Sequence, residues 1–256
     1  MSGPVDPTVA AGAVERPLIS VCVPVYQAHD APNLASLAAS VPASLGELAG
    51  ELIVALNGVS AEQAGVPAGV RAVDLGVNRG VAPGWNAAAR CARGEVLVFA
   101  NDDVILGAGS LERLATALRE HPEAGVVGPL GARVDLSRLR HEAWIDPNGR
   151  SPGELLECDI VSGFLLATRR EVYERAGGFD ESYAPCTCEE MDFCVAVRMR
   201  QRLGCYVVAG VEHHHRFHIS SARPWRRLSH NGRREMLWRI HRRNTRYFKR
   251  KWAGQL

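Results

Sequence analysis

The sequence predicts an α/β fold in which helices flank a mostly parallel central sheet. In the first half of the chain, strand-like and helix-like segments alternate four times, which is typical of a doubly wound sheet. One strand-like segment, Glu95–Phe99, is mostly apolar and β-branched or aromatic, as expected of a strand buried on both faces. It leads into Asn101, Asp102 and Asp103, and α/β folds place their ligand sites at such carboxyl ends of strands.

The first half of the chain supplies most of the expected strands. They lie, in order, at Leu18–Pro24, Glu51–Leu56, Val70–Leu75, Glu95–Phe99 and Gly125–Pro129. The helices between them are expected around Leu34–Ala39, Pro83–Cys91 and Ser110–Glu120. Pro83 suits a first helical turn, and Ser110 is expected to cap its helix. No GxGxxG motif follows the first strand, so a dinucleotide site of the usual kind is not expected.

The second half of the chain is less regular. Residues 130–157 contain a turn at Pro147-Asn148-Gly149 but no clear period. A strand at Asp159–Thr168 is interrupted by Ser162-Gly163, and a glycine inside a strand often marks the close approach of a ligand or another backbone. A short helix, a loop, a long helix and a strand then follow, at Arg169–Ala176, Ser182–Cys188, Glu189–Leu203 and Cys205–Ala209.

Charge divides the chain into an acidic body and a basic tail. Between Ala222 and Trp252 there are 12 lysines and arginines but one acid, Glu235. Apolar and aromatic residues alternate with these cations, which predicts one or two basic amphipathic helices. Such a tail suits a polyanionic partner: an anionic membrane, the acidic body of this chain or of a homodimer partner, or an anionic acceptor. Nucleic acid is the competing polyanion, but nothing in the body supports it, so no nucleic-acid binding is expected.

These patterns predict a domain organisation. Residues 1–17 are expected to be a disordered lead-in, residues 18–221 one α/β domain, and residues 222–256 the basic tail. The lead-in does not have the pattern of a secretory signal, and no apolar run approaches the roughly 20 residues that span a bilayer. The seven cysteines have no regular spacing and are expected to be reduced thiols. We therefore expect a cytoplasmic protein, peripheral at the inner membrane face.

Two acidic clusters are candidates for chemistry. Asp102 and Asp103 either form a turn or cap, or bind a hard divalent ion such as Mg²⁺ or Mn²⁺ through their oxygens. Glu189, Glu190 and Asp192 either complement a helix dipole or include a general base. On a helix, Glu189 and Asp192 share a face while Glu190 points elsewhere.

Other side chains leave alternatives open. His213, His214 and His215 follow the last strand and are either solvated or metal ligands. Trp85 is either a core residue or a stacking surface for a base or sugar. A zinc site is the alternative to free thiols at three cysteines, although their Cys-x-Cys spacing is unlike that of structural zinc sites; these are Cys186, Cys188 and Cys194.

Four segments resemble, in their order along the chain, those of family-two glycosyltransferases with the GT-A fold. The segments are ISVCVPVY, NRGVAPGWNAAARCARGEVLVFANDDV, SGFLLATRREVYERAGGFDESY and CEEMDFCVAVR. The resemblance extends from about Leu18 to Ser221 and is closest in style to the rhamnosyltransferase-like branch. It implies a GT-A fold with a nucleotide-binding half at about 18–130 and an acceptor half at about 131–221.

The resemblance also implies roles for individual residues. A nucleotide pocket is implied for Pro24, Tyr26, Asn57, Asn78, Gly80, Asn86 and Asp102. Asp103 matches the metal-binding carboxylate, and His213 and His215 are candidates for a histidine near the metal. Gly163 matches a turn that borders the sugar and the acceptor, and Trp85 is the candidate for stacking there.

The Glu189-Glu190 pair matches the motif that supplies the catalytic base, and Asp192 matches a following acceptor-side acid. Leu56 and Glu190 depart from the family, which usually has Asp at both positions.

The reaction implied by the resemblance is an inverting sugar transfer. A nucleotide-diphosphate donor, a dTDP- or UDP-sugar, passes its sugar to a hydroxyl of a glycan, a lipid-linked or a small-molecule acceptor. Mg²⁺ or Mn²⁺ on Asp103 neutralises the leaving diphosphate, and Glu190 accepts the proton of the attacking hydroxyl. The alternative is a non-catalytic nucleotide-sugar or glycan-binding protein of the same fold.

Overall fold

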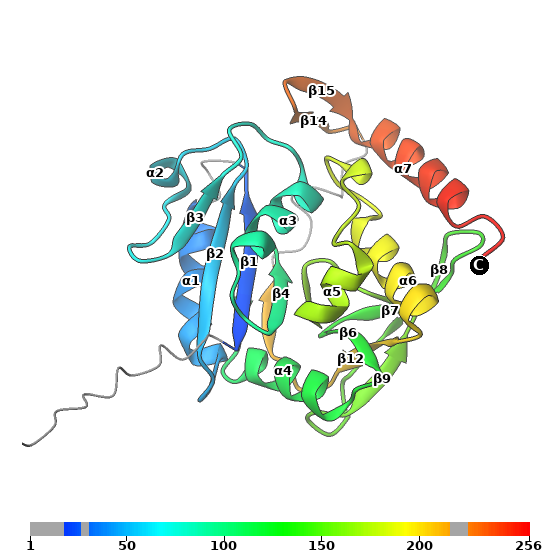
Figure 1. Cartoon of the computed structure of the whole chain (residues 1–256), viewed down its shortest axis with the longest axis horizontal. Helices are drawn as coiled ribbons and strands as arrows, with labels where there is room; N and C mark the ends of the chain where they lie inside the picture. Colours follow the sequence, from blue (N-terminus) through cyan, green and yellow to red (C-terminus); the bar gives the residue numbers. More distant parts are fainter. Residues whose placement is uncertain (1–17, 27–30, 216–224) are drawn as a thin grey trace, which may run out of the picture.

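The computed structural model describes residues 18–26, 31–215 and 225–256. The lead-in expected over residues 1–17 and the start of the tail at 222–224 lie outside the described residues. One eight-stranded sheet forms the centre of the molecule (Figure 1), with the strand order β3-β2-β1-β4-β11-β6-β12-β9. Its strands are β1 Ile19–Val25, β2 Gly50–Leu56, β3 Arg71–Asp74, β4 Val96–Ala100, β6 Ala124–Gly128, β9 Leu155–Cys158, β11 Leu165–Arg169 and β12 Gly204–Val208.

Parallel pairings dominate this sheet, as the sequence predicted. Strand β1 runs parallel to β2 and β4, β2 to β3, and β6 to β12. Strand β11 is antiparallel to both of its neighbours, and β9 is antiparallel to β12 at the edge. The carboxyl ends of β1, β2 and β4 therefore lie at one edge of the sheet, where parallel folds collect polar groups.

Helices cover both faces of the sheet (Figure 1) because its central strands are apolar on both sides. In β1, Val21 and Val23 pack into one core with α1 and α4, whereas Cys22 packs into a second core with α3, α5 and α6. The helices are α1 Ala31–Ser44, α2 Ala61–Ala64, α3 Val81–Cys91, α4 Ser110–Glu120, α5 Arg170–Ala176, the 3₁₀ turn η2 Glu181–Tyr183, α6 Glu189–Gln201 and α7 Leu237–Lys251.

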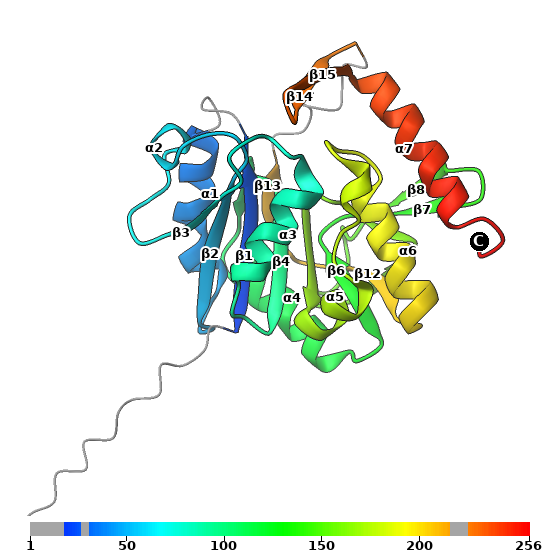
Figure 2. The same ribbon diagram turned by 45° about the horizontal axis from the view of Figure 1, so that its top comes forward.

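Three small sheets complete the fold. Strands β10, β7 and β8 form one of them, β13 pairs with β5, and β14 pairs with β15. Their bounds are β5 Val104–Leu106, β7 Gly131–Asp135, β8 Arg140–Ile145, β10 Ile160–Val161, β13 His213–His215, β14 Arg227–His230 and β15 Arg233–Met236. In both views, the β14–β15 hairpin lies above the central sheet and α7 runs along the outside of α6 (Figures 1 and 2).

The structure corrects two local predictions. Ser110 does not cap α4: Gly109 holds the cap position in the left-handed region, at φ 67°, and no side chain caps the helix. The basic tail is not purely helical, because the β14–β15 hairpin precedes the single helix α7. None of the helices in the described part of the chain is long and apolar enough to cross a membrane.

Phe99 of β4 is a fully buried member of an aromatic core cluster, and we expect Phe99→Ala to destabilise the protein. Its ring lies 4.8 Å from that of Phe179 and 5.2 Å from that of Tyr173, measured between centroids. Truncation leaves a cavity and should lower the free energy of unfolding by about 3–5 kcal/mol in urea denaturation. Val77→Ala, at a side chain that is 48% exposed, is the control and should change it by less than about 0.5 kcal/mol.

Candidate active site

A cavity of about 780 Å³ opens at the sheet edge where β1, β2 and β4 end. Its walls bring together most of the residues that the sequence singled out. These are Pro24, Tyr26, Asn57, Asn78, Gly80, Trp85, Asp102, Asp103, Gly163, Glu189, Glu190 and His215. Three of the predicted residues, Asn86, Asp192 and His213, do not line it.

On the side of β2, asparagine side chains hold the chain in place. Asn57 is buried, donates to the Gly80 carbonyl over 2.8 Å and accepts from the Arg79 amide over 2.6 Å. Asn78 accepts from the Gly80 amide and donates to the Ser229 carbonyl of β14. These bonds fix the shape of the pocket wall and tie it to the tail.

Gly80 lies where the wall approaches the loop before α6. Its φ is 104°, and an added Cβ would lie 2.7 Å from both the Cα and the carbonyl oxygen of Pro185. The next residue, Val81, donates its amide to that same carbonyl over 2.8 Å. The position therefore requires glycine for both its conformation and its space.

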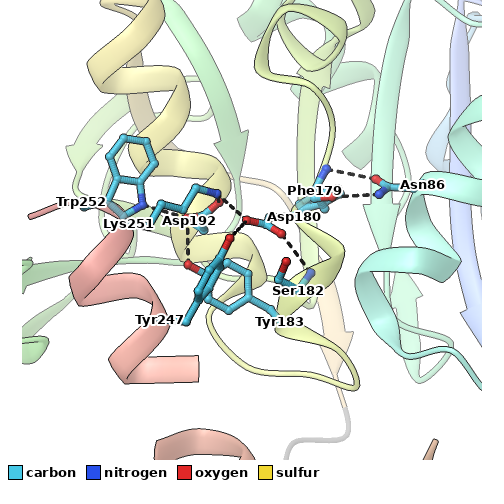
Figure 3. Close-up of polar contacts among 9 residues, drawn as sticks. All are labelled: Asn86, Phe179, Asp180, Ser182, Tyr183, Asp192, Tyr247, Lys251 and Trp252. Atoms are coloured by element: carbon cyan, nitrogen blue, oxygen red, sulfur yellow. Dashed lines mark hydrogen bonds and ion pairs between the residues drawn. The ribbon is translucent and has the colours of Figure 1, made fainter. Parts of the chain in front are cut away.

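Asn86 serves the core instead of the cavity. Its side chain donates to the Phe179 carbonyl and accepts from the Phe179 amide (Figure 3). It also donates to Glu181 and accepts from the Tyr173 hydroxyl. With these bonds, Asn86 joins α3 to the turn after α5. The nucleotide-contact role that the sequence suggested for it therefore has no support in the geometry.

Asp103 and His215 meet in the lining of the same cavity. The β13–β5 pairing sets His215 beside Val104, so that its Nε2 lies 3.2 Å from Asp103 Oδ1. Phe164 stacks on the imidazole, with 4.4 Å between ring centroids. Both side chains are largely buried, and Asp103 Oδ1 has no hydrogen-bond partner among the described residues besides this contact with His215.

A carboxylate oxygen and an imidazole nitrogen that converge in this way can share a divalent cation. No group of three His, Cys, Asp or Glu side chains suited to a metal ion occurs in residues 18–26, 31–215 and 225–256. A cation at Asp103 would therefore take its remaining ligands from phosphate oxygens and water, as Mg²⁺ commonly does.

Neither His213 nor the cysteines join this pair. His213 Nδ1 lies 3.1 Å from the Val211 carbonyl, and its ring packs against Phe164. The zinc alternative finds no ligand set among the described residues, and all seven cysteines, each of them described, are free thiols.

Glu189 and Glu190 line the same cavity, at the start of α6. Burial raises the pKa of both carboxyls, and the neighbouring charge of Glu190 raises that of Glu189 further. Glu189 is 5% exposed, and its Oε2 is buried without a hydrogen-bond partner in the described parts of the chain. A Cβ at Gly163 would lie 3.2 Å from the side chain of Glu190, so the close approach expected at this glycine is made by Glu190.

Asp192 is turned away from the cavity and toward α7. Its carboxylate accepts from the Tyr183 hydroxyl over 2.9 Å and from Trp252 Nε1 over 2.8 Å, and Lys251 Nζ lies 2.7 Å away (Figure 3). These donors occupy the carboxylate, so the geometry does not support an acceptor contact for Asp192.

Trp85 is a core residue. It is 1% exposed, and its ring packs against Phe99 and Phe179. Of the two alternatives that the sequence left open, the structure favours the core.

Residues of the tail also line the cavity, and sequence reasoning missed them. Leu228 and Ser229 of β14 and Leu237 of α7 contribute to its wall. The available signal was Asn231-Gly232, since Asn-Gly marks a tight hairpin. Both residues have positive φ, 48° and 71°, as such a turn requires.

We expect Glu189→Gln to stabilise the protein, and to do so more as the pH rises. A carboxyl whose pKa is raised by folding contributes stability below its unfolded pKa, and this stability is lost as the pH rises through the folded pKa. Glutamine removes that loss, so the increase in Tm should be small at about pH 5 and larger at about pH 8. Glu120→Gln, at the exposed end of α4, should show no such trend. An increase in the Tm of Glu189→Gln that is equal at both pH values would contradict this account.

Comparisons with known proteins agree with this architecture. A model of glycosyl transferase family 2 matches residues 20–177. N-acetylglucosaminyl-diphospho-decaprenol L-rhamnosyltransferase from two strains of Mycobacterium tuberculosis is 28% identical over 158 residues, covering 50% of this chain and 49% of the relative. The chain thus spans about half the length of the curated relatives it matches.

Solved structures show the same fold. The mannosyltransferase PcManGT from Pyrobaculum calidifontis, in complex with GDP-Man and Mn²⁺, is 22% identical and covers 78% of this chain and 56% of its own, with a TM-score of 0.52. GalNAc-T7 with UDP, GalNAc and Mn²⁺ is 12% identical and covers 79% of this chain and 44% of its own, with a TM-score of 0.61. Because the family model matches more than half of the residues, the chain belongs to glycosyl transferase family 2 and has the GT-A fold.

Proposed function

We propose that this chain is a metal-dependent, inverting glycosyltransferase that moves a sugar from a dTDP- or UDP-sugar to an acceptor hydroxyl, with Glu190 as the general base. One observation carries the proposal: a single cavity is lined by both the Asp103–His215 pair and the Glu189–Glu190 pair. A donor diphosphate beside the first pair and an acceptor hydroxyl beside the second would place the sugar between them.

The metal part of the proposal rests on Asp103 and His215. A bound Mg²⁺ or Mn²⁺ would neutralise the diphosphate as it leaves. Asp103 would hold it through its buried Oδ1, and His215, fixed by Phe164, would be the second protein ligand. The two neighbours solved with Mn²⁺ and a nucleotide or nucleotide sugar support a divalent ion in this fold.

Glu190 is the better placed of the two glutamates to act as a base. It is less buried than Glu189 and lies against Gly163, at the turn that leads into β11. A base is most effective when its pKa lies near the working pH, and burial shifts the pKa of Glu190 upward in that direction. Glu189 would remain beneath it as a like-charged neighbour.

The acceptor is proposed to be a glycan, a lipid-linked sugar or a small molecule. The M. tuberculosis relative is named for rhamnosyl transfer to a diphospho-decaprenol-linked sugar, which supports a lipid-linked acceptor. Trp144 of β8 lines the same cavity and is 59% exposed. Its ring offers an apolar surface to an acceptor near Glu190.

A nucleotide-binding experiment tests the donor side of the proposal. Thermal unfolding of the protein would be followed with UDP, dTDP, GDP or CDP, each with Mn²⁺, Mg²⁺ or a chelator. A nucleotide at 100 times its Kd should add about 2.7 kcal/mol to the stability, and the shift should require metal. Asp103→Ala should abolish the metal-dependent part, and Glu112→Ala on α4 is the control. Failure of every nucleotide to shift the melting of the unsubstituted protein would contradict the proposal.

Replacing the base tests the chemical step. Glu190→Gln should leave the metal-dependent nucleotide shift intact and lower the turnover by about 10²–10⁴-fold. Turnover is measured as release of nucleoside diphosphate from the sugar nucleotide that the binding screen identifies. Near-normal turnover would exclude Glu190 as the base. Nucleotide binding without turnover in the unsubstituted protein, across the acceptor classes, would favour the non-catalytic alternative.

We further propose that the outer face of α7 contacts an anionic membrane, where a lipid-linked acceptor would be found. Trp225 and Trp238 are 74% and 37% exposed, and tryptophan is enriched at membrane interfaces. The one acid of this region, Glu235, is paired with Arg243. The remaining exposed cations are Arg227, Arg233, Arg234, Arg239, Arg242, Arg246, Lys249 and Arg250. The homodimer expected from the sequence stays a prediction.

Neutralising this face should weaken vesicle binding. With Arg239, Arg242 and Arg246 all replaced by Gln, each lost charge removes about 1 kcal/mol near an anionic surface. Together these losses should reduce partition into phosphatidylglycerol vesicles roughly a hundredfold at low salt, and less at high salt.

A triple variant at exposed arginines elsewhere on the molecule should bind as the unsubstituted protein does; its sites are Arg90, Arg119 and Arg175. If both triple variants lose the same vesicle binding, the net charge of the protein and not a particular docking face would explain the binding.

A further inference from the structure

The inner face of α7 is bound to the body of the protein through a partly buried cation, Lys251. Lys251 Nζ lies 2.7 Å from Asp180 Oδ2 and 2.7 Å from Asp192 Oδ2 (Figure 3). The Lys251 side chain is 19% exposed and that of Asp192 is 4% exposed. This lysine therefore joins three elements: α7, the turn before η2, and the first turn of α6.

Neutral donors complete this cluster. The Tyr247 hydroxyl donates to Asp180 over 2.9 Å, and the Ser182 amide donates to the other oxygen of the same carboxylate. Although burial opposes it, the bonds from Lys251 and Ser182 hold the pKa of Asp180 at about 2. Asp180 therefore stays ionised and paired with Lys251 at neutral pH.

Asn244 lies two turns before Lys251 on the same face of α7. It holds the segment between η2 and α6. Its amide is buried and donates to the carbonyls of Tyr183, Cys186 and Thr187 over 2.6, 2.8 and 3.1 Å. Thr187 and Cys188 have φ values of 80° and 73°, which residues other than glycine rarely adopt. Such a conformation persists only where surrounding contacts impose it, and Asn244 supplies these contacts.

This segment leads directly into the Glu189–Glu190 pair. Cys188 is the N-cap of α6, so its backbone sets the direction in which the two carboxylates leave the helix. The same segment meets the donor side, because the Pro185 carbonyl accepts from the Val81 amide. A shift of residues 185–188 would therefore move the base relative to the donor pocket.

We propose that Lys251 and Asn244 are positioning residues of the active site: through Asp192 and residues 183–188, they fix Glu189 and Glu190 against the cavity. The inference rests on the proposed function in taking this pair as the site of the base. Asp192, which matches an acceptor-side acid by sequence, is on this account the point where α6 is fastened to α7.

The test compares two variants of the inner face with a matched outer residue. Lys251→Met and Asn244→Ala should lower nucleotide release from the identified sugar nucleotide about a hundredfold, since a displacement of about 1 Å can cost that much. The Kd of the nucleoside diphosphate with Mn²⁺ should stay within about twofold, because Asp103 and Asn57 are untouched. Lys251→Arg, which can still bridge both carboxylates, should restore turnover. His241→Ala, at an exposed position of the same helix, is the control and should have no effect.

Hydrogen exchange measures the positioning directly and does not depend on the proposed function. In Asn244→Ala, the amides of residues 183–190 should exchange at least about tenfold faster, while those of β1 and β4 stay unchanged. Unchanged exchange and unchanged turnover in the two inner-face variants would overturn the inference. If Lys251→Met does not melt cooperatively, Tyr247→Phe, which removes only the hydroxyl bond to Asp180, takes its place and should lower turnover measurably. If Glu190→Gln keeps full turnover while exchange responds as expected, the base assignment fails and the positioning stands.

Discussion

The burial of three carboxylates in one helical turn is the constraint on which the rest of this structure depends. Glu189, Glu190 and Asp192 stand in the first turn of α6, and burying a charge is unfavourable unless it is paired. Asp192 is paired through Lys251, with two neutral donors besides. The glutamates are left with the helix N-terminus and each other. Lys251 of the tail thus neutralises Asp192, whereas Glu189 and Glu190 remain at the cavity.

The basic tail is explained by the two faces of α7. Its inner face supplies Lys251 and Asn244 to the acidic body, and that contact makes the tail part of the domain. Its outer face carries exposed cations, among them Arg242 and Arg246. The three partners considered for the tail from sequence are therefore not exclusive, because the acidic body takes one face and leaves the other for a surface outside the protein.

Much of the fold could be predicted because its determinants are local. The apolar strands β2 and β4 are followed closely by the polar residues Asn57 and Asp103. The helix α3, with Pro83 in its first turn, could also be predicted from the sequence alone. The pairing of β13 with β5 could not be predicted, since each segment has three residues and their contact is set by the fold. That pairing distinguishes the two histidines, because it sets His215 beside Val104 and next to Asp103, whereas His213 lies beside Leu106, further along the strand. Asp192 was misleading for a related reason: its pattern fits a site acid, but Lys251 lies 59 residues further along the chain.

The pairing of Asp192 with Lys251 helps to explain how a base could work in a helical turn that holds three acidic residues. The amide dipole of a helix N-terminus favours ionised carboxylates, whereas burial and a like-charged neighbour oppose ionisation. If Asp192 were unpaired, a third charge would oppose ionisation of Glu190 still more. Paired with Lys251, Asp192 adds little to that repulsion. Burial and the one remaining like-charged neighbour, Glu189, then oppose the effect of the dipole on Glu190. Burial still raises the pKa of this carboxyl, and a carboxylate with a raised pKa is the stronger proton acceptor, which is what a base at this position would have to be.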